Sequence, residues 1–260
     1  ASKYFFYLNS GSFRPLWTYF AEKSGSEIIY INYGSGFFGF KNISTNEYPK
    51  QLITGLYTMN WPKYVVDKIL FYNYLKKLHL NMNIYLSKNQ IHTSDSGSIL
   101  PKFDSSKYTI SVFDISPVRN FSRLLQLPQD EFRETSLCIK FIRDIETIGK
   151  KFNINVLYKK KRKITSRDCK RYANLTKHLN MINVDPDISS ERLSKISNLI
   201  ISTPFTTAAF NYNKFNKINS IFYSPLNLIS KDDRGSQGLP IVCGFIALEN
   251  FIKKELKLIK

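Results

Sequence analysis

The sequence predicts an α/β fold in which parallel β-strands are covered by α-helices on both faces. Short apolar runs alternate with longer segments whose apolar residues recur near the 3.6-residue period of a helix. Strands separated by helices pair in parallel, because the crossover helix carries the chain back to the same end of the sheet. With 260 residues and 43% hydrophobic residues, the chain can bury one large core or two smaller ones.

The first part of the chain shows this alternation less regularly than the second. Apolar and aromatic runs predict strands at residues 4–8, 27–33 and 83–86. Helices are predicted at residues 15–23 and 62–80. The longer helix carries Val65, Ile69 and Tyr72 near a helical period. A stretch rich in Ser, Gly, Pro and Asp at residues 93–104 predicts a linker, which divides the chain into domains at residues 1–104 and 105–260.

The second part repeats the alternation regularly. Strands are predicted at residues 108–113, 154–158, 182–184, 199–202, 220–223 and 239–242. Helices are predicted at residues 133–152, 166–179, 189–197, 206–215 and 247–258. In such sheets ligands bind beyond the carboxyl ends of the strands. We therefore expect the site in the residues that directly follow strands, at 114–119, 159–162, 185–187, 202–207 and 224–226.

The chain is strongly basic, which favours anionic partners. Its formal net charge is +18, and residues 105–260 hold 27 Lys and Arg against 14 Asp and Glu. Nucleic acid, a phosphorylated ligand and an acidic membrane surface all fit this balance.

Cysteine spacing and hydropathy predict the cellular compartment in which the protein is found. Cys138, Cys169 and Cys243 show no paired spacing, which favours a reducing compartment. No apolar stretch reaches the roughly 18–20 residues that span a bilayer, and no signal peptide is recognisable. We expect a cytoplasmic protein that can rest on the anionic inner face of the membrane. Because the chain opens with Ala1 and at once with a strand, we expect the N-terminal domain to be incomplete.

A hydroxyl-rich segment at residues 202–207 (STPFTT) joins a predicted strand to a predicted helix. Thr206 or Thr207 would begin the helix, where free N–H groups and the helix dipole attract an anion such as phosphate. The alternative is that Thr206 only caps the helix.

A basic run at residues 159–163 (KKKRK) follows the strand at residues 154–158. At that end of a strand, Lys159 and Arg162 could clamp a diphosphate or a sugar carboxylate. A solvated basic loop is the alternative, and contact with acidic lipid is a further use of such a run.

Asp114 follows the strand at residues 108–113, where a carboxylate can act as general base on an acceptor hydroxyl. It could equally cap the turn that Ser116 and Pro117 imply.

Other segments carry weaker signals. Residues 231–240 form a loop, either one that closes over a ligand or a plain surface loop. Asp232 and Asp233 within it are weak evidence for a divalent metal, and we predict no metal site. The glycine motif of dinucleotide sites, the P-loop and the nucleophile elbow are absent. Asp185 and Asp187 are expected to end a strand and cap the next helix.

Residues 108–247 resemble a bacterial surface-polysaccharide biosynthesis family named for its Pro-Phe-Thr-Ser motif. The resemblance rests on residues 113–117 (FDISP), 126–129 and 132–135 (QLPQ, FRET), 159–162 (KKKR), and 204–207 and 222–225 (PFTT, FYSP). Thr207 replaces the family's Ser and keeps a hydroxyl. Ser224 stands where the family commonly has Asp, which removes a carboxylate.

This resemblance implies a glycosyltransferase with two Rossmann-like domains facing a cleft, the GT-B arrangement. It is also similar to bacterial sialic-acid and Kdo transferases, which hold a CMP-linked sugar with a hydroxyl pair and basic residues. On this basis Asp114 is the expected catalytic base. The donor and its phosphate are expected to contact Lys159, Lys161, Arg162, Ser202, Pro204, Phe205, Thr206, Thr207, Tyr223 and Ser224. No metal or cofactor is expected, because lysine and arginine would neutralise the phosphate.

The expected partners are a nucleotide sugar, a glycan or lipid-linked acceptor, and the anionic inner membrane. Two other functions stay open. A nucleic-acid-binding protein fits the charge, but no nucleic-acid-binding motif occurs, so no specific nucleic acid is expected. A non-catalytic scaffold of a polysaccharide assembly complex would keep the fold and lack turnover.

Overall fold

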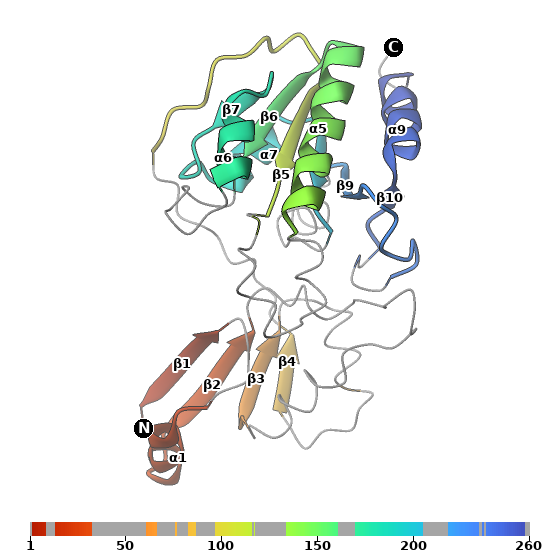
Figure 1. Ribbon diagram of the computed structural model, residues 1–260. Helices are drawn as coiled ribbons and strands as arrows, with labels where there is room; N and C mark the ends of the chain where they lie inside the picture. Colours follow the sequence, from red (N-terminus) through yellow and green to blue (C-terminus); the bar gives the residue numbers. More distant parts are fainter. Residues whose placement is uncertain are drawn as a thin grey trace. The chain divides into compact units, whose positions relative to one another are not determined.

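The computed structural model describes a large part of the chain (Figure 1). The described residues are 2–8, 14–32, 61–66, 76, 83–86, 97–115, 117, 134–160, 170–204, 218–233, 236 and 238–257. The chain divides into two compact units, one of residues 1–40 and 45–92, the other of residues 41–44 and 93–260. Each unit is built on a parallel sheet.

The first unit has a four-stranded sheet in the order β1-β2-β3-β4. Its described elements are β1 (Lys3–Leu8), α1 (Leu16–Lys23), β2 (Glu27–Asn32), β3 (Lys63–Val66) and β4 (Asn83–Leu86). Each strand pairs in parallel with the next. Aromatic rings fill the centre of this unit, where Tyr30 stacks on Tyr64 with ring centroids 4.9 Å apart and contacts Trp61 at 4.8 Å.

One predicted helix of this unit is wrong at its start. The helical period at residues 62–80 predicts a helix, yet Lys63–Val66 is strand β3, paired with β2 and β4. Val65 and Val66 are β-branched and favour a strand, and the Tyr64 ring gains its contact with Tyr30 only from that register. Lys76 is helical, and the other positions from 67 to 82 lie outside the described residues.

The second unit has a six-stranded parallel sheet in the order β10-β9-β8-β5-β6-β7. Its strands are β5 (Thr109–Phe113), β6 (Asn155–Lys159), β7 (Ile182–Val184), β8 (Leu199–Ser202), β9 (Ser220–Ser224) and β10 (Ile241–Cys243). Its described helices are α5 (Thr135–Phe152), α6 (Lys170–Lys177), α7 (Ser190–Lys195) and α9 (Phe245–Lys257). Numbered along the chain, the strands lie in the order 3-2-1-4-5-6, which is that of Rossmann-type sheets.

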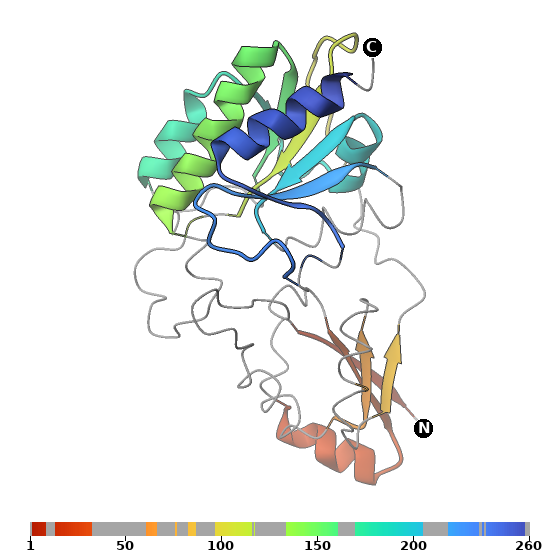
Figure 2. The same ribbon diagram turned by 90° about the vertical axis from the view of Figure 1, so that its right-hand side faces the viewer.

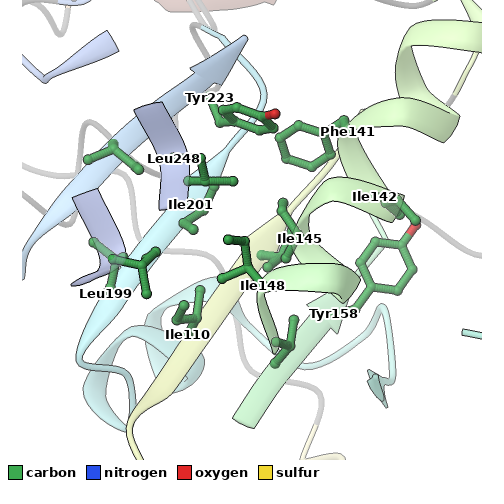
Figure 3. Packing of buried hydrophobic residues seen from close by; sticks show 14 of the residues in the cluster. Ile110, Phe141, Ile142, Ile145, Ile148, Tyr158, Leu199, Ile201, Tyr223 and Leu248 are labelled. Atoms are coloured by element: carbon green, nitrogen blue, oxygen red, sulfur yellow. The ribbon is translucent and has the colours of Figure 1, made fainter. Parts of the chain in front are cut away.

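Helices cover both faces of this sheet, as the alternation predicts. On one face, α5 and α9 pack over the sheet (Figures 1 and 2), with Ile145 and Leu248 among the buried residues of the main cluster. Figure 3 shows side chains of α5 pointing at Ile110 and Ile201 of the central strands. On the other face, the Ser111 hydroxyl lies 2.6 Å from that of Ser197, just beyond α7.

Helix α5 shows why the local sequence folds as it does. Its buried residues recur at helical spacing and form one face, made of Leu137, Cys138, Phe141, Ile142, Ile145, Ile148 and Gly149. The helix ends at Asn153, a left-handed residue with φ 50° and ψ 48°, a conformation that asparagine tolerates. The predicted helix at residues 206–215 and the predicted cap Ser166 lie outside the described residues.

Candidate functional site

The candidate site lies where the strand order of the second sheet reverses, between β5 and β8. Chain connections leave these neighbouring strands in opposite directions, which opens a crevice beyond their carboxyl ends. Phe113 of β5 is paired with Ser202 of β8, so Asp114 and Thr203 leave the sheet side by side. A hydrogen bond from the Thr203 N–H to the Phe113 carbonyl, 3.2 Å long, extends the ladder by one step.

Asp114 is buried in a cluster with two tyrosines. Its side chain is 5% exposed, and its Oδ2 accepts hydrogen bonds from the hydroxyls of Tyr158 and Tyr172. The two hydroxyl oxygens lie 2.9 Å apart. Tyr158 belongs to β6 and Tyr172 to α6, so the carboxylate that follows β5 is bonded by a strand and a helix that come after α5 in the chain.

Both tyrosines remain protonated hydrogen-bond donors. Burial raises the pKa of Tyr158 and of Tyr172 well above the usual value, and the nearby Asp114 charge raises each pKa further. Because a neutral phenol can donate its proton and a phenolate cannot, the cluster keeps two donors on the carboxylate.

Lys159 ends β6 on the face of the sheet opposite Asp114, because side chains alternate along a strand. Its ammonium donates to the Pro186 carbonyl, 2.8 Å away, in the segment after β7. Burial lowers the pKa of Lys159, and the charges of Asp187, Asp114 and Asp185 oppose that shift. The structure therefore brings Lys159 to the predicted edge with its side chain turned to the β7 side.

A small pocket opens at the same edge, between the start of α5 and the ends of β8 and β9. It is lined by Leu137, Cys138, Phe141, Thr203, Pro204, Tyr223, Ser224, Pro225 and Leu228. The enclosed space of this pocket is about 10 Å³, which is room for about one water molecule.

The ring of Tyr223 lines this pocket, while its hydroxyl is hydrogen-bonded to a side chain of α5. The ring packs on Phe141, with centroids 5.7 Å apart (Figure 3). The hydroxyl donates to Asp144 Oδ2 at 2.6 Å, and Asp144 is also paired with Lys140 at 3.0 Å. Tyr223 is therefore placed to shape the pocket wall through its ring.

A comparison with protein families identifies the family of this chain. A model of polysaccharide biosynthesis PFTS motif proteins matches residues 1–252. The chain belongs to this family. A comparison with curated proteins gives no match. In the described residues of this PFTS motif protein, no helix is long and apolar enough to span a membrane.

Six predicted site residues of the PFTS motif protein lie at the carboxyl edge of the second sheet. They are Asp114, Lys159, Ser202, Pro204, Tyr223 and Ser224. The other predicted residues fall outside the described part of the chain: Lys161, Arg162, Phe205, Thr206 and Thr207. Among the described residues, no three His, Cys, Asp or Glu side chains gather as metal ligands would.

Two residues of this edge escape prediction from the sequence, Tyr158 and Tyr172, while Thr203 lies inside the predicted segment 202–207 without being assigned a contact of its own. The two tyrosines reach Asp114 across 44 and 58 residues of chain, a distance over which periodicity carries no information. Thr203 carries a usable signal, because a hydroxyl directly after a buried strand is a common ligand position. Its Oγ1 is buried and makes no hydrogen bond within the described structure.

Proposed function

We propose that this PFTS motif protein is a glycosyltransferase that uses a nucleotide-activated sugar in surface-polysaccharide synthesis. The observation that carries the proposal is the reversal of strand order between β5 and β8, with Asp114 and a pocket at its edge. Nucleotides bind in such crevices of Rossmann-type sheets. Membership of a polysaccharide biosynthesis family supports a sugar as the transferred group.

The whole enzyme is proposed to have the GT-B arrangement, with an acceptor-side domain in the first unit (residues 1–40 and 45–92) and a donor domain in the second (residues 41–44 and 93–260). The donor we favour is a CMP-linked acidic sugar, because the run at residues 159–163 can hold a carboxylate as well as a phosphate. The acceptor is a glycan or a lipid-linked glycan. The charge of +18 supports peripheral contact with anionic lipid, which would bring the enzyme to such an acceptor.

In the proposed reaction, an acceptor hydroxyl oxygen bonds to the anomeric carbon of the donor sugar as the bond to the nucleotide phosphate breaks. Asp114 takes the proton of that hydroxyl, and the tyrosines on its Oδ2 hold the carboxylate in place. The departing phosphate gains negative charge, which helix N–H groups, Thr206, Thr207 and the basic side chains Lys161 and Arg162 would stabilise.

Calorimetric titration with CMP, UDP, GDP, TDP and their sugars tests the donor site. We expect selective binding of one nucleotide and loss of that binding in the double variant Thr206→Ala/Thr207→Ala. Absence of binding for every nucleotide and every nucleotide sugar would overturn the transferase proposal, and would favour the scaffold.

The role of Asp114 gives a sharper prediction. Asp114→Asn keeps the shape of the side chain and removes its basicity, so we expect sugar transfer to fall by about 10²–10⁴-fold. Nucleotide affinity should stay within a few-fold, because the proton is taken from the acceptor. Transfer of a radiolabelled sugar to a membrane extract measures the first quantity, and calorimetry the second.

Asp104→Asn is the matched control, because Asp104 is a carboxylate of the same unit, bonded to the Ser106 N–H at the exposed surface. Equal transfer by Asp114→Asn and wild type would show that Asp114 is not the base.

A further inference from the structure

Helix α1 of the first unit turns polar side chains inward and apolar side chains outward, which is the reverse of an ordinary surface helix. Thr18 and Glu22 lie four residues apart on one face of the helix, and Arg14, just before the helix, joins them. Arg14 and Thr18 are buried. The Arg14 guanidinium donates a 3.0 Å hydrogen bond to the Thr18 hydroxyl and forms an ion pair with Glu22. A polar network therefore occupies the inward face of α1.

The outward face of α1 carries large apolar side chains. Leu16 is 75% exposed, Trp17 49% and Phe20 70%. Phe20 lies one helical turn from each of the other two, so the three side chains are neighbours on the helix surface. Tyr4 of β1 is also exposed, and its ring meets the Trp17 ring edge-on with centroids 5.3 Å apart. Single exposed apolar residues are common, whereas a contiguous group indicates an interaction surface. We call Tyr4, Leu16, Trp17 and Phe20 the α1 patch.

The charge of the first unit favours an anionic partner. Glu22 and Glu27 are the only acidic residues among its described positions, and each is paired with a basic side chain. The same positions hold five Lys and Arg. Lys23, in the last turn of α1, follows Phe20 by three residues and is exposed. An anionic surface is therefore attracted to this unit and meets no unpaired carboxylate among these residues.

The size and composition of the α1 patch favour a lipid bilayer over a protein partner. A stable protein interface takes about 20–30 residues from each side, and the patch has four side chains, three of them on a helix of eight residues. Partial insertion at the boundary between lipid headgroups and acyl chains needs only a few large apolar side chains with lysines beside them. Trp and Tyr rings favour that boundary, because each combines an apolar ring with a polar group.

We propose that the α1 patch docks the protein on an anionic lipid bilayer, with Leu16, Trp17 and Phe20 inserted at the headgroup boundary. Lys23 contacts the lipid phosphates beside them. The inference rests on the proposed function and deepens it, because it locates in the first unit the membrane contact that a lipid-linked acceptor requires. The inserted side chains contribute apolar burial, and the basic charge of the chain contributes attraction to the anionic surface.

The test is sedimentation of the whole chain with vesicles of equal parts phosphatidylglycerol and phosphatidylcholine. Leu16→Gln/Phe20→Gln replaces the two most exposed side chains of the α1 patch. We expect the double variant to bind these vesicles about tenfold or more weakly, because burial of even one such side chain in an apolar medium changes affinity by about that factor. Its melting temperature and nucleotide affinity should match those of wild type, since both side chains are already exposed in the folded protein.

Ile99→Gln/Ile246→Gln is the matched control, because it replaces two apolar side chains of the second unit that are at least as exposed. Its vesicle affinity should equal that of wild type, which separates the α1 patch from a general loss of surface hydrophobicity.

Tryptophan fluorescence gives a readout that does not depend on a variant. The chain has two tryptophans, and Trp61 is buried, so a blue shift of the emission on addition of vesicles reports insertion of Trp17. Lipids with brominated acyl chains should quench the same emission.

Two results would overturn the membrane surface: no binding of the anionic vesicles by wild type, or equal binding by wild type and Leu16→Gln/Phe20→Gln. A dimer in analytical ultracentrifugation that the double variant abolishes, together with no vesicle binding, would assign the α1 patch to a second copy of the chain instead. Nucleotide-sugar binding without vesicle binding would leave the proposed transferase intact and remove this inference. Vesicle binding through the α1 patch in a chain that binds no nucleotide or nucleotide sugar would do the reverse.

Discussion

At the scale of single residues, the main feature of the candidate site is a carboxylate oxygen that accepts two phenolic hydrogen bonds. Asp114 Oδ2 receives both Tyr158 and Tyr172, and all three side chains are at most 5% exposed. A buried carboxylate is stable only if it is hydrogen-bonded or paired, and these two phenols contribute to that stabilisation. Lys159 is near enough for its charge to interact with Asp114, yet its ammonium is bonded to the next loop.

Removing either phenol should therefore cost stability. Tyr172→Phe and Tyr158→Phe are each expected to lower the free energy of unfolding by about 1.5–3 kcal/mol, the range for hydrogen bonds to charged groups. Urea unfolding followed by circular dichroism measures this change.

Tyr108→Phe is the control, because its ring packs against the same core and no hydrogen bond of its hydroxyl is recorded among the described residues. Since the two phenols also contact each other, the double variant should lose less than the sum of the single losses. A change within error for both single variants would show that the cluster does not stabilise the fold.

At the scale of elements, α5 is held against the sheet by close approach. A Cβ atom on Gly149 would lie 2.7 Å from Cγ2 of Val156 in β6, a distance that real Cβ contacts do not show. Val156 is buried and branched, so it cannot swing aside as a long side chain would. The helix therefore needs glycine here, although glycine is a poor helix former.

Gly149→Ala should consequently destabilise the protein, although alanine favours a helix by about 1 kcal/mol over glycine. Overpacking of this kind costs about 1–3 kcal/mol, and the clash should outweigh the gain. Thermal unfolding of Gly149→Ala, Val156→Ala and the double variant tests this. The double variant should recover part of the loss, and additive losses would contradict the proposed clash.

The predicted elements show what periodicity can and cannot establish. Helix α5 and strand β7 appear close to their predicted bounds, since both carry clear patterns bounded by turn residues. The weak helical period at residues 62–80 wrongly predicted a helix where strand β3 lies. Pairing with β2 and β4 outweighs that local preference.

Strand order is a different matter, because local patterns do not say which distant strands pair. The sequence predicts a parallel sheet with Asp114 at its carboxyl edge. The crevice exists because β5 pairs with β8, and only the folded structure shows that pairing. The same holds for the tyrosines on Asp114, whose positions depend on how β6 and α6 pack. Residues after strands were therefore predictable as a set, while their partners and the faces on which they lie were not.

At the scale of the whole molecule, buried phenols make the fold sensitive to alkali. Burial raises the pKa of Tyr30 to about 12, and it also raises the pKa of four further tyrosines: Tyr108, Tyr158, Tyr172 and Tyr223. Above their usual pKa of about 10, the unfolded chain releases these protons and the folded chain keeps them. The unfolded state then binds fewer protons, so stability must fall as the pH rises.

We expect stability to change little with these groups below pH ~10 and to decline above it, by up to about 1.4 kcal/mol per pH unit for each tyrosine still protonated in the fold. Lys159 acts in the opposite direction, because its lowered pKa adds stability as the pH approaches 10.5. Urea unfolding at a series of alkaline pH values measures the slope. Tyr223→Phe should reduce it, and a flat profile would contradict the burial of these phenols.

The central position of β5 in its sheet has a consequence for the synthesis of this protein on the ribosome. The strand is made first in its sheet, yet one of its two neighbours, β8, begins only at Leu199. At about 5–20 residues per second, the roughly 86 residues from Phe113 to Leu199 take about 4–17 s to synthesise. During that interval the nascent chain carries an open edge with Ile110 and Val112 beside it, which other chains can join. Chaperones that bind extended apolar segments therefore have a defined period in which to protect it.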